Sequence, residues 1–235
     1  MTLIETMTEL EKLGSEQTRK IYTNHGCKSA MFGVSVANLK TILKQTKKDH
    51  ELALKLYDTG NADAQYLAGL MADAKKLTTK DLQNWANNAS WYMVAEYSVA
   101  WNVAESPHCI ELAENWINSK DENLQAIGWA SLSSHLIYEK REPIESSFLD
   151  TCLNKIEREI HNSGNRVKYT MNGFIIALGA SESEFFKTCQ DLAKRIGKVE
   201  VFMGKTSCKV PEAVSYLEKI KTMGRLGKKK KTMKC

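Results

Sequence analysis

The sequence predicts an all-α protein, and three observations support that prediction. The 235 residues include only 3 prolines and no pair of adjacent glycines, so residues that interrupt helices are scarce. Apolar residues recur at helical spacing through nearly the whole chain. Helix start signals precede several of these segments. A hydrophobic content of 43% and a charged content of 26% are ordinary for a globular protein with a substantial core.

The predicted helices can be followed in order from their start signals. Ser15 is an N-cap candidate for the second helix, and Thr78 with Asp81 three residues later forms a capping-box pattern before the sixth. Ser106 followed by Pro107 places a proline in the first turn of the eighth. With ends good to about 2–4 residues, the helices are 2–13, 15–24, 35–47, 49–58, 62–73, 79–88, 90–104, 107–118, 122–137, 145–161, 165–178, 182–196 and 211–222.

Three of these helices share a sequence pattern. DAQYLAGL from Asp63, NLQAIGWA from Asn123 and RVKYTMNG from Arg166 each begin with a polar residue, have a long polar residue two positions later, and continue with small and apolar residues. Short connections between the helices favour antiparallel neighbours. Helix pairs that repeat in this way are typical of a curved α-solenoid, in which one helix of each pair lines a concave face.

One segment departs from the helical pattern. Residues 198–210 alternate apolar and polar side chains, reverse near Gly204, and continue to Val210. This pattern predicts a short β-hairpin near the C-terminus. Its lysines, Lys198, Lys205 and Lys209, are candidates for contact with a nucleic-acid backbone. The alternative is that the hairpin packs over the end of the solenoid.

Positive charge is concentrated at the C-terminus. The net charge is +5, yet the 8 basic residues from Lys219 onward have no acidic residue among them, and the rest of the chain carries 25 basic against 28 acidic side chains. We expect residues 225–235 to form a disordered basic tail that binds a polyanion through Lys228, Lys229, Lys230 and Lys231. A purely solubilising tail is the alternative. Residues 1–224 are expected to form a single helical domain.

Several classes of protein are disfavoured by the sequence. No segment approaches the roughly 20 apolar residues that span a bilayer, and the acidic N-terminus does not resemble a signal peptide. The cysteines are scattered without a CxxC pair, and the five histidines lack ligand spacing. We therefore expect a monomeric cytoplasmic protein without a metal or another cofactor.

The segment from Ser90 to Trp101, SWYMVAEYSVAW, contains two tryptophans, two tyrosines and one carboxylate. In a helix, Tyr92 and Glu96 are four residues apart and share a face. An aromatic ring beside an acid suits a stacked base or a cationic ligand. The same residues are also a common way to fill a core.

Three segments carry a resemblance to a known family. SWYMVAE, NLQAIGWASL and NRVKYTMNGFIIALG resemble segments of the HEAT-like-repeat DNA alkylation repair superfamily, the AlkD-like proteins. In the glycosylase branch of that superfamily, the first segment reads Trp-Trp-Asp-x-Val-Asp and supplies an aromatic ring and a catalytic aspartate. Trp91 and Tyr92 match the two tryptophans, Met93 stands at the first aspartate, and Glu96 matches the catalytic one.

The sequence departs from the glycosylase pattern at several positions. The family's Leu-Arg-Arg-x-Ala segment corresponds to Ala126–Trp129, which contains no arginine, and Phe174 is the best match to a third cleft aromatic residue. Glutamate is one methylene longer than aspartate, and a misplacement on the order of 1 Å can cost ~10²-fold in rate. The resemblance therefore implies a sister branch that keeps a DNA-binding solenoid, lacks base excision and prefers branched DNA such as Holliday junctions.

The sequence leaves three functions open. The first is a bacterial, nucleoid-associated protein that binds branched or distorted DNA through phosphate contacts. The second is a 3-methyladenine or 7-methylguanine DNA glycosylase that uses Glu96, and the third is a helical scaffold that binds protein. Besides the lysines named above, the candidate DNA-binding residues are Tyr92, Glu96, Arg166, Lys168, Tyr169, Asn172 and Phe174.

Overall fold

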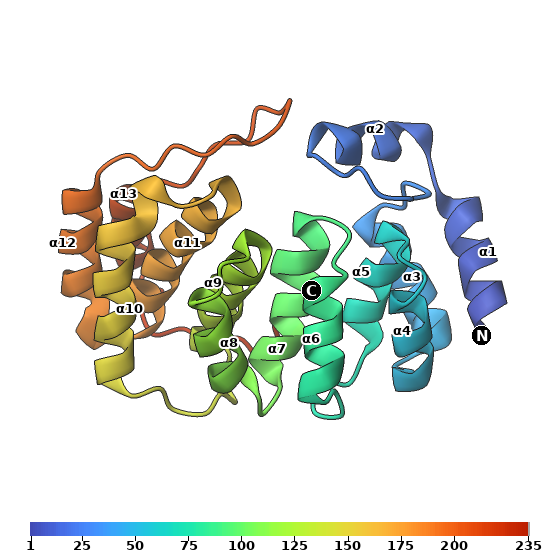
Figure 1. The fold of residues 1–235 in the computed structure, drawn as a ribbon, viewed down its shortest axis with the longest axis horizontal. Coiled ribbons are helices and arrows are strands. Elements are labelled where there is room, and N and C mark those ends of the chain that lie inside the picture. Colours follow the sequence, from blue (N-terminus) through green and yellow to red (C-terminus); the bar gives the residue numbers. More distant parts are fainter. Residues whose placement is uncertain (235) are drawn as a thin grey trace.

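The computed structural model describes residues 1–234, and its helices stand side by side in one row from α1 to α12 (Figure 1). The segment 198–211 projects from the row beyond α11, and α2 projects on the same side (Figure 1). The α-helices are α1 (Leu3–Leu13), α2 (Glu16–Asn24), α3 (Val36–Thr46), α4 (His50–Tyr57), α5 (Ala62–Met71), α6 (Thr79–Asn87), α7 (Ala100–Glu105), α8 (Cys109–Ile117), α9 (Glu122–Leu136), α10 (Ser146–Glu159), α11 (Asn165–Ser181), α12 (Phe186–Ile196) and α13 (Ala213–Thr222). A π-helical segment, η1 (Val94–Val99), precedes α7, and short 3-10 turns, η2 (Ile160–Asn162) and η3 (Ser183–Phe185), flank α11.

Most helices begin where the sequence signals predict. The exception is α8, which starts at Cys109 with His108 as its N-cap, so Pro107 lies before the helix and not in its first turn. Thr2 and Thr78 form capping boxes with Glu5 and Asp81, and Ser15 accepts a hydrogen bond from the third residue of α2. Every predicted helix has a counterpart whose ends agree to within about four residues. The all-α prediction is therefore confirmed for the described residues.

Four successive segments, α5, η1 with α7, α9 and α11, form the interior of the row. All ten residues of α5 are buried, and most of α9 is buried as well. Close packing of the segments needs small residues: a Cβ atom at Gly69 of α5 would lie 2.4 Å from the Cβ atom of Ser98. This requirement explains why the three segments that share a sequence pattern, from Asp63, Asn123 and Arg166, are rich in small and apolar residues.

The polar residue that opens each of these three segments occupies the same position in its helix and makes a contact of the same kind. Asp63, Asn123 and Arg166 are each the second residue of their helix, α5, α9 and α11. Asp63 accepts hydrogen bonds from the backbone of residues 32–34, and the Asn123 amide donates to the Ala86 carbonyl at 3.2 Å. Arg166 binds Glu96. Each residue thus ties its helix to an earlier part of the chain.

The predicted hairpin at residues 198–210 has no strand ladder. Within residues 1–234 there is no β-strand, and the one isolated bridge joins Tyr138 to Lys230. The segment runs out and back as an irregular loop, here called the bridging loop (residues 198–211) (Figure 1). Its backbone pairs elsewhere: Lys205 donates its N–H to the Asn24 carbonyl at 3.0 Å. Each arm bonds to another part of the molecule, so the arms do not pair with each other.

The basic C-terminus differs from the expected disordered tail. Residues 225–234, here called the C-terminal strap, cross the carboxyl ends of α11, α9 and α5 in turn. The Gly227 N–H binds the Ala180 carbonyl at 2.8 Å, Lys229 Nζ binds the Leu136 carbonyl at 2.8 Å, and Lys234 Nζ binds the Ala72 carbonyl at 2.5 Å. Helix carboxyl ends carry unpaired carbonyls and partial negative charge, which attract lysine. The strap therefore packs against the ends of these helices, and only Cys235 lies outside the described residues.

No helix within residues 1–234 is both long enough and apolar enough to cross a bilayer.

Candidate functional site

The site begins with Glu96, the acid of the aromatic segment. Glu96 lies in the π-helical segment η1 and is 6% exposed. Wide π-helical turns are rare and occur frequently at functional sites. Arg166 binds both oxygens of this carboxylate: its Nε lies 2.6 Å from Oε1, and its Nη2 binds Oε2. This bidentate geometry is the strongest form of a guanidinium–carboxylate contact.

Two tyrosine rings enclose the Arg166 guanidinium. Its Cζ atom lies 4.1 Å from the ring centroid of Tyr92 and 4.4 Å from that of Tyr169. Both distances are within the range of a cation–π interaction. We call Tyr92, Glu96 and Tyr169 the cage, and Arg166 is the cation inside it.

Burial and ion pairing act in opposite directions on the pKa of both members of the pair. Burial raises the pKa of the Glu96 carboxyl, and the hydrogen bonds from Arg166 oppose that rise. For Arg166, burial acts to lower the pKa, but the contacts with Glu96 raise it, and the net change is upward. The guanidinium therefore stays protonated at all ordinary pH values. With Glu96 ionised, the buried pair has no net charge.

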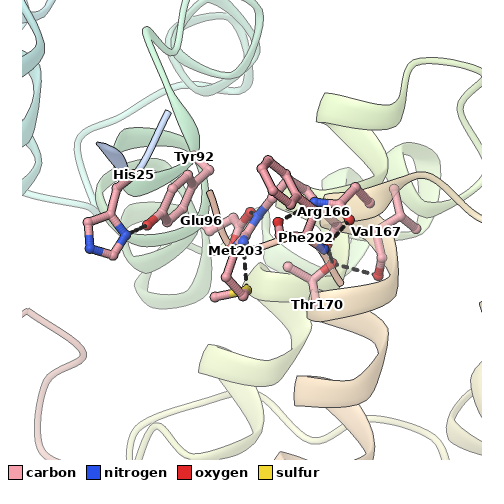
Figure 2. A network of polar contacts seen from close by, with 9 residues as sticks. His25, Tyr92, Glu96, Arg166, Val167, Thr170, Phe202 and Met203 are labelled. Atoms are coloured by element: carbon pink, nitrogen blue, oxygen red, sulfur yellow. Dashed lines mark hydrogen bonds and ion pairs between the residues drawn. The ribbon is translucent and has the colours of Figure 1, made fainter. Parts of the chain in front are cut away.

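Residues from distant parts of the chain meet around the cage (Figure 2). The Tyr92 hydroxyl lies 3.1 Å from His25 Nδ1 at the end of α2, on the side away from Glu96. Arg166 Nη1 lies 3.9 Å from the sulfur of Met203, at the tip of the bridging loop. Thus α2, η1, α11 and the bridging loop all contact one site.

The tip of the bridging loop is fixed in two places. Asn165, the first residue of α11, binds the backbone of Phe202 twice, at 2.7 Å to its N–H and at 2.8 Å to its carbonyl. Gly204 packs against the end of α2 with a φ of +75°, and a Cβ atom there would lie 2.3 Å from the Asn24 carbonyl oxygen. A glycine is required at this position for both reasons. The loop thus spans from the C-terminal helices to α2.

Some of the predicted site residues come together and others do not. One cluster contains Tyr92, Glu96, Arg166 and Tyr169. Lys168, which precedes Tyr169 in the sequence, is half-buried. Asn172 is buried and donates to the Pro211 carbonyl at 2.9 Å, so its amide holds the bridging loop in place.

Phe174 lies in the core and not in a cleft, contrary to the prediction from the sequence. It is 0% exposed and packs edge-on against Trp129, with ring centroids 5.2 Å apart. The middle of α11 lies between α9 and α13, so a side chain on this face enters the core. The prediction that Phe174 lines a DNA-binding cleft is therefore wrong for this structure.

The predicted lysines fall into two separate groups. Lys198, Lys205 and Lys209 are exposed on the bridging loop, near the amino end of α11. Lys228, Lys230 and Lys231 are exposed on the C-terminal strap, while the ammonium of Lys229 binds Leu136 and Glu182. The seventeen residues of α11 separate its two ends by about 25 Å. The two groups of lysines therefore belong to different surfaces.

Several residues of the site were not among the predictions. The pairing of Glu96 with Arg166 spans 70 residues, and no local pattern in one sequence indicates such a contact. Asn165, Phe202 and Met203 were likewise missed. A signal existed for Phe202 alone, as a large apolar residue beside the predicted turn.

The chemistry available at the site is limited. Among residues 1–234, no three side chains of His, Cys, Asp or Glu gather closely enough to hold a metal ion. The cage provides one carboxylate and two aromatic rings, and Arg166 already contacts all three groups. This arrangement binds a cation between aromatic rings, and the cation present is the protein's own.

Comparison with known proteins identifies the family. The family described as DNA alkylation repair enzyme matches residues 6–188. The chain belongs to that family. Its curated relatives include uncharacterized proteins of Listeria innocua and Listeria monocytogenes, each 34% identical over 218 residues, which cover 90% of this chain and 94% of the relative.

A solved structure supports the same relationship at the level of the fold. It is described as a new family of proteins related to the HEAT-like repeat DNA glycosylases with affinity for branched DNA structures. The match has a TM-score of 0.91 and 35% sequence identity and covers 100% of both chains. The repeat architecture predicted from the sequence, and the resemblance to the DNA alkylation repair superfamily, are therefore confirmed.

Proposed function

We propose that this protein binds branched DNA through phosphate contacts and does not excise bases. The observation that carries the proposal is the position of Arg166, inside the cage and bonded to both oxygens of Glu96. The solved relative described as having affinity for branched DNA supports DNA as the partner.

The occupied cage argues against base excision. Removal of an alkylated base leaves a sugar with oxocarbenium character, and a nearby free carboxylate can stabilise that charge. In this protein, the carboxylate of Glu96 is neutralised by Arg166, and the guanidinium fills the space between the two tyrosine rings. Breaking a buried ion pair costs about 3–5 kcal/mol, which a substrate base would have to offset.

The bridging loop is the main candidate for phosphate contact. Apart from the region from Lys219 onward, acidic side chains slightly outnumber basic ones, so binding to DNA depends on where cations gather. Lys198, Lys205 and Lys209 are exposed on one short loop that is fixed at its tip. Each phosphate that a lysine neutralises releases counterions and makes binding depend on salt.

A binding titration tests the proposal. Affinity for a four-way junction and for a linear duplex of matched length is measured across a range of salt concentrations. We expect tighter binding to the junction and a fall in affinity as salt rises for both DNAs. Equal, weak and salt-independent affinity for the two DNAs would contradict the proposal.

The second candidate function is an alkylpurine glycosylase that uses Glu96. It is favoured by one observation: Glu96 stands where the resemblance places a catalytic aspartate, with two tyrosine rings beside it. DNA that contains 7-methylguanine or 3-methyladenine is incubated with excess protein, and released base is measured. Release by the wild type that Glu96→Gln abolishes would establish this function in place of the first.

A further inference from the structure

A pocket lies between the two arms of the bridging loop. Its volume is about 1030 Å³, near the upper end of the range of about 300–1,000 Å³ that is usual for small-molecule sites. Both arms of the loop contribute to the walls, together with the end of α12 and the start of α13. The walls are largely apolar and include Val199, Val201, Val210, Pro211 and Val214.

Hydrogen bonds hold the pocket open. Asn165 fixes the backbone of Phe202 on the outgoing arm, and Asn172 holds the Pro211 carbonyl on the returning arm. Asn172 is 3% exposed and itself lines the pocket. The two arms are thus anchored to α11 at separate points. These anchors keep the arms apart, so the pocket between them is part of the folded structure.

An exposed aromatic ring stands at the pocket. Phe202 lines it and is 74% exposed, although its backbone is fixed by the two bonds to Asn165. A large apolar side chain in water on a fixed backbone contributes little to folding. Aromatic rings placed in this way are the usual platforms on which single-stranded bases stack.

The charge around the pocket favours an anionic occupant. Lys194, Lys198 and Lys209 line it, against two acidic residues, Glu200 and Glu212. Glu200 is paired with Lys198 at 2.9 Å on the fully solvated side of the loop, where such a pair is weak. An apolar space with an aromatic ring and lysines matches the two parts of a nucleotide, its base and its phosphate.

We infer that this pocket binds an unpaired nucleotide at a DNA branch point, with the base stacked on Phe202 and the flanking phosphates at Lys194 and Lys209. The inference rests on the proposed binding of branched DNA and deepens it. A duplex keeps its bases stacked inside the helix, whereas a branch can present an unstacked base. The pocket therefore provides a physical basis for a preference for branched DNA that phosphate contacts alone do not.

The test uses a three-way junction with one unpaired 2-aminopurine at the branch point. Affinity is measured from the anisotropy of a label at the end of one arm, and stacking is measured from the emission of 2-aminopurine. We expect wild-type protein to quench the 2-aminopurine. Phe202→Ala is expected to abolish the quenching and to weaken junction binding by about tenfold, as expected for the loss of one base–aromatic stack, while duplex affinity stays the same.

Two further variants identify the cause of the effect. Phe202→Trp keeps a stacking ring and should retain both quenching and affinity. Tyr216→Ala removes another exposed aromatic side chain, 47% exposed on α13 and outside the pocket wall, and should have no effect. All three substitutions are at exposed side chains, so the thermal midpoint should not change.

The outcomes separate this inference from the proposed function. If the Phe202→Ala protein quenches 2-aminopurine and prefers the junction as the wild type does, the pocket is not the site of the unpaired base. The proposed binding of branched DNA is then unaffected. If wild-type protein binds neither junction nor duplex, both the proposed function and this inference are wrong.

Discussion

The bridging loop and the C-terminal strap are alike in sequence and opposite in structure. Both are irregular, lysine-rich segments in the last 40 or so residues of the chain, and both were expected to contact DNA. The strap lies across the carboxyl ends of three helices, where Lys229 and Lys234 bind main-chain carbonyls. The loop lies near the opposite end of α11, and its lysines face solvent. A lysine-rich segment thus stabilises the fold where its backbone lies near hydrogen-bond acceptors of the protein, and it is free to bind a ligand where it does not.

Deletion of residues 228–235 should have the largest effect, and that effect should be on stability and not on DNA binding. The deletion removes the contact of Lys229 with Leu136, the two backbone hydrogen bonds of Lys230 and the burial of Met233, together worth roughly 5 kcal/mol. We expect the thermal midpoint to fall by on the order of 10–20 °C. Junction affinity, measured at a temperature where the shortened protein is folded, should change little. A large loss of affinity with an unchanged midpoint would show that the strap binds DNA.

Lys234 makes the stability that the strap contributes depend on pH. Burial lowers the pKa of the Lys234 ammonium from 10.5 to about 8, despite the nearby carboxylates of Glu105 and Asp73 and with a further lowering by Lys48. The unfolded chain therefore binds more protons than the folded chain between about pH 8 and 10.5, so this group makes the protein more stable as the pH rises through that window.

The measurement compares the wild type with Lys234→Met in chemical unfolding at pH 7 and at pH 10. The wild type should gain roughly 1–3 kcal/mol relative to the variant between these two values. Other titrating groups are common to both proteins and cancel in the difference. A difference that is the same at both pH values would mean that Lys234 is not buried as an ammonium.

Removal of charge from the loop should affect binding and leave folding intact. The triple variant Lys198→Gln, Lys205→Gln and Lys209→Gln should lower junction affinity by about tenfold or more and reduce the slope of log affinity against log salt by up to about 3. The matched control is Lys228→Gln, Lys230→Gln and Lys231→Gln on the strap, which changes three exposed lysines as well. If the control variant loses as much affinity as the loop variant, the two segments do not differ in the way proposed.

The smallest effect is expected where the loop meets α2. Gly204→Ala places a Cβ atom against the Asn24 carbonyl in a backbone conformation that alanine disfavours, so the backbone must shift, at a cost of about 1–3 kcal/mol. We expect a loss of stability of that size and faster amide exchange at Lys205, whose N–H binds Asn24. Gly224→Ala, a glycine that also has a positive φ but an open surrounding, is the control for backbone strain alone. Equal exchange at Lys205 in both variants would argue against close contact between the loop and α2.

Local patterns were enough to predict most of the fold. The caps at Ser15 and Thr78, and the scarcity of proline, act within a turn or two of helix and do not depend on distant residues. The hairpin predicted at 198–210 is not confirmed, because alternation of side chains describes an extended chain, and whether two extended arms pair depends on what else their backbones can bond. Asn24 and Asn165 decided that outcome.

The site was predictable only in part. Tyr92, Glu96, Arg166 and Tyr169 were each selected from the sequence, two from an aromatic–acid pattern and two from the start of a helix. Their assembly was not predicted, because a bidentate ion pair across 70 residues depends on how α11 packs beside η1. Phe174 failed for the same reason: its helix was correct, but the buried side of that helix depends on α9 and α13.

By itself, the sequence determined the helices, their repeat and the family, since these follow from local propensity and from residues close together in the chain. Only the tertiary structure decided which charges are free. Arg166 is paired with Glu96, and Lys229 and Lys234 bind helix carbonyls. In the part of the chain described, the loop lysines face solvent, apart from the pairing of Lys198 with Glu200. The physical reason is that a charge binds the acceptors around it in space, and long-range packing alone determines those acceptors.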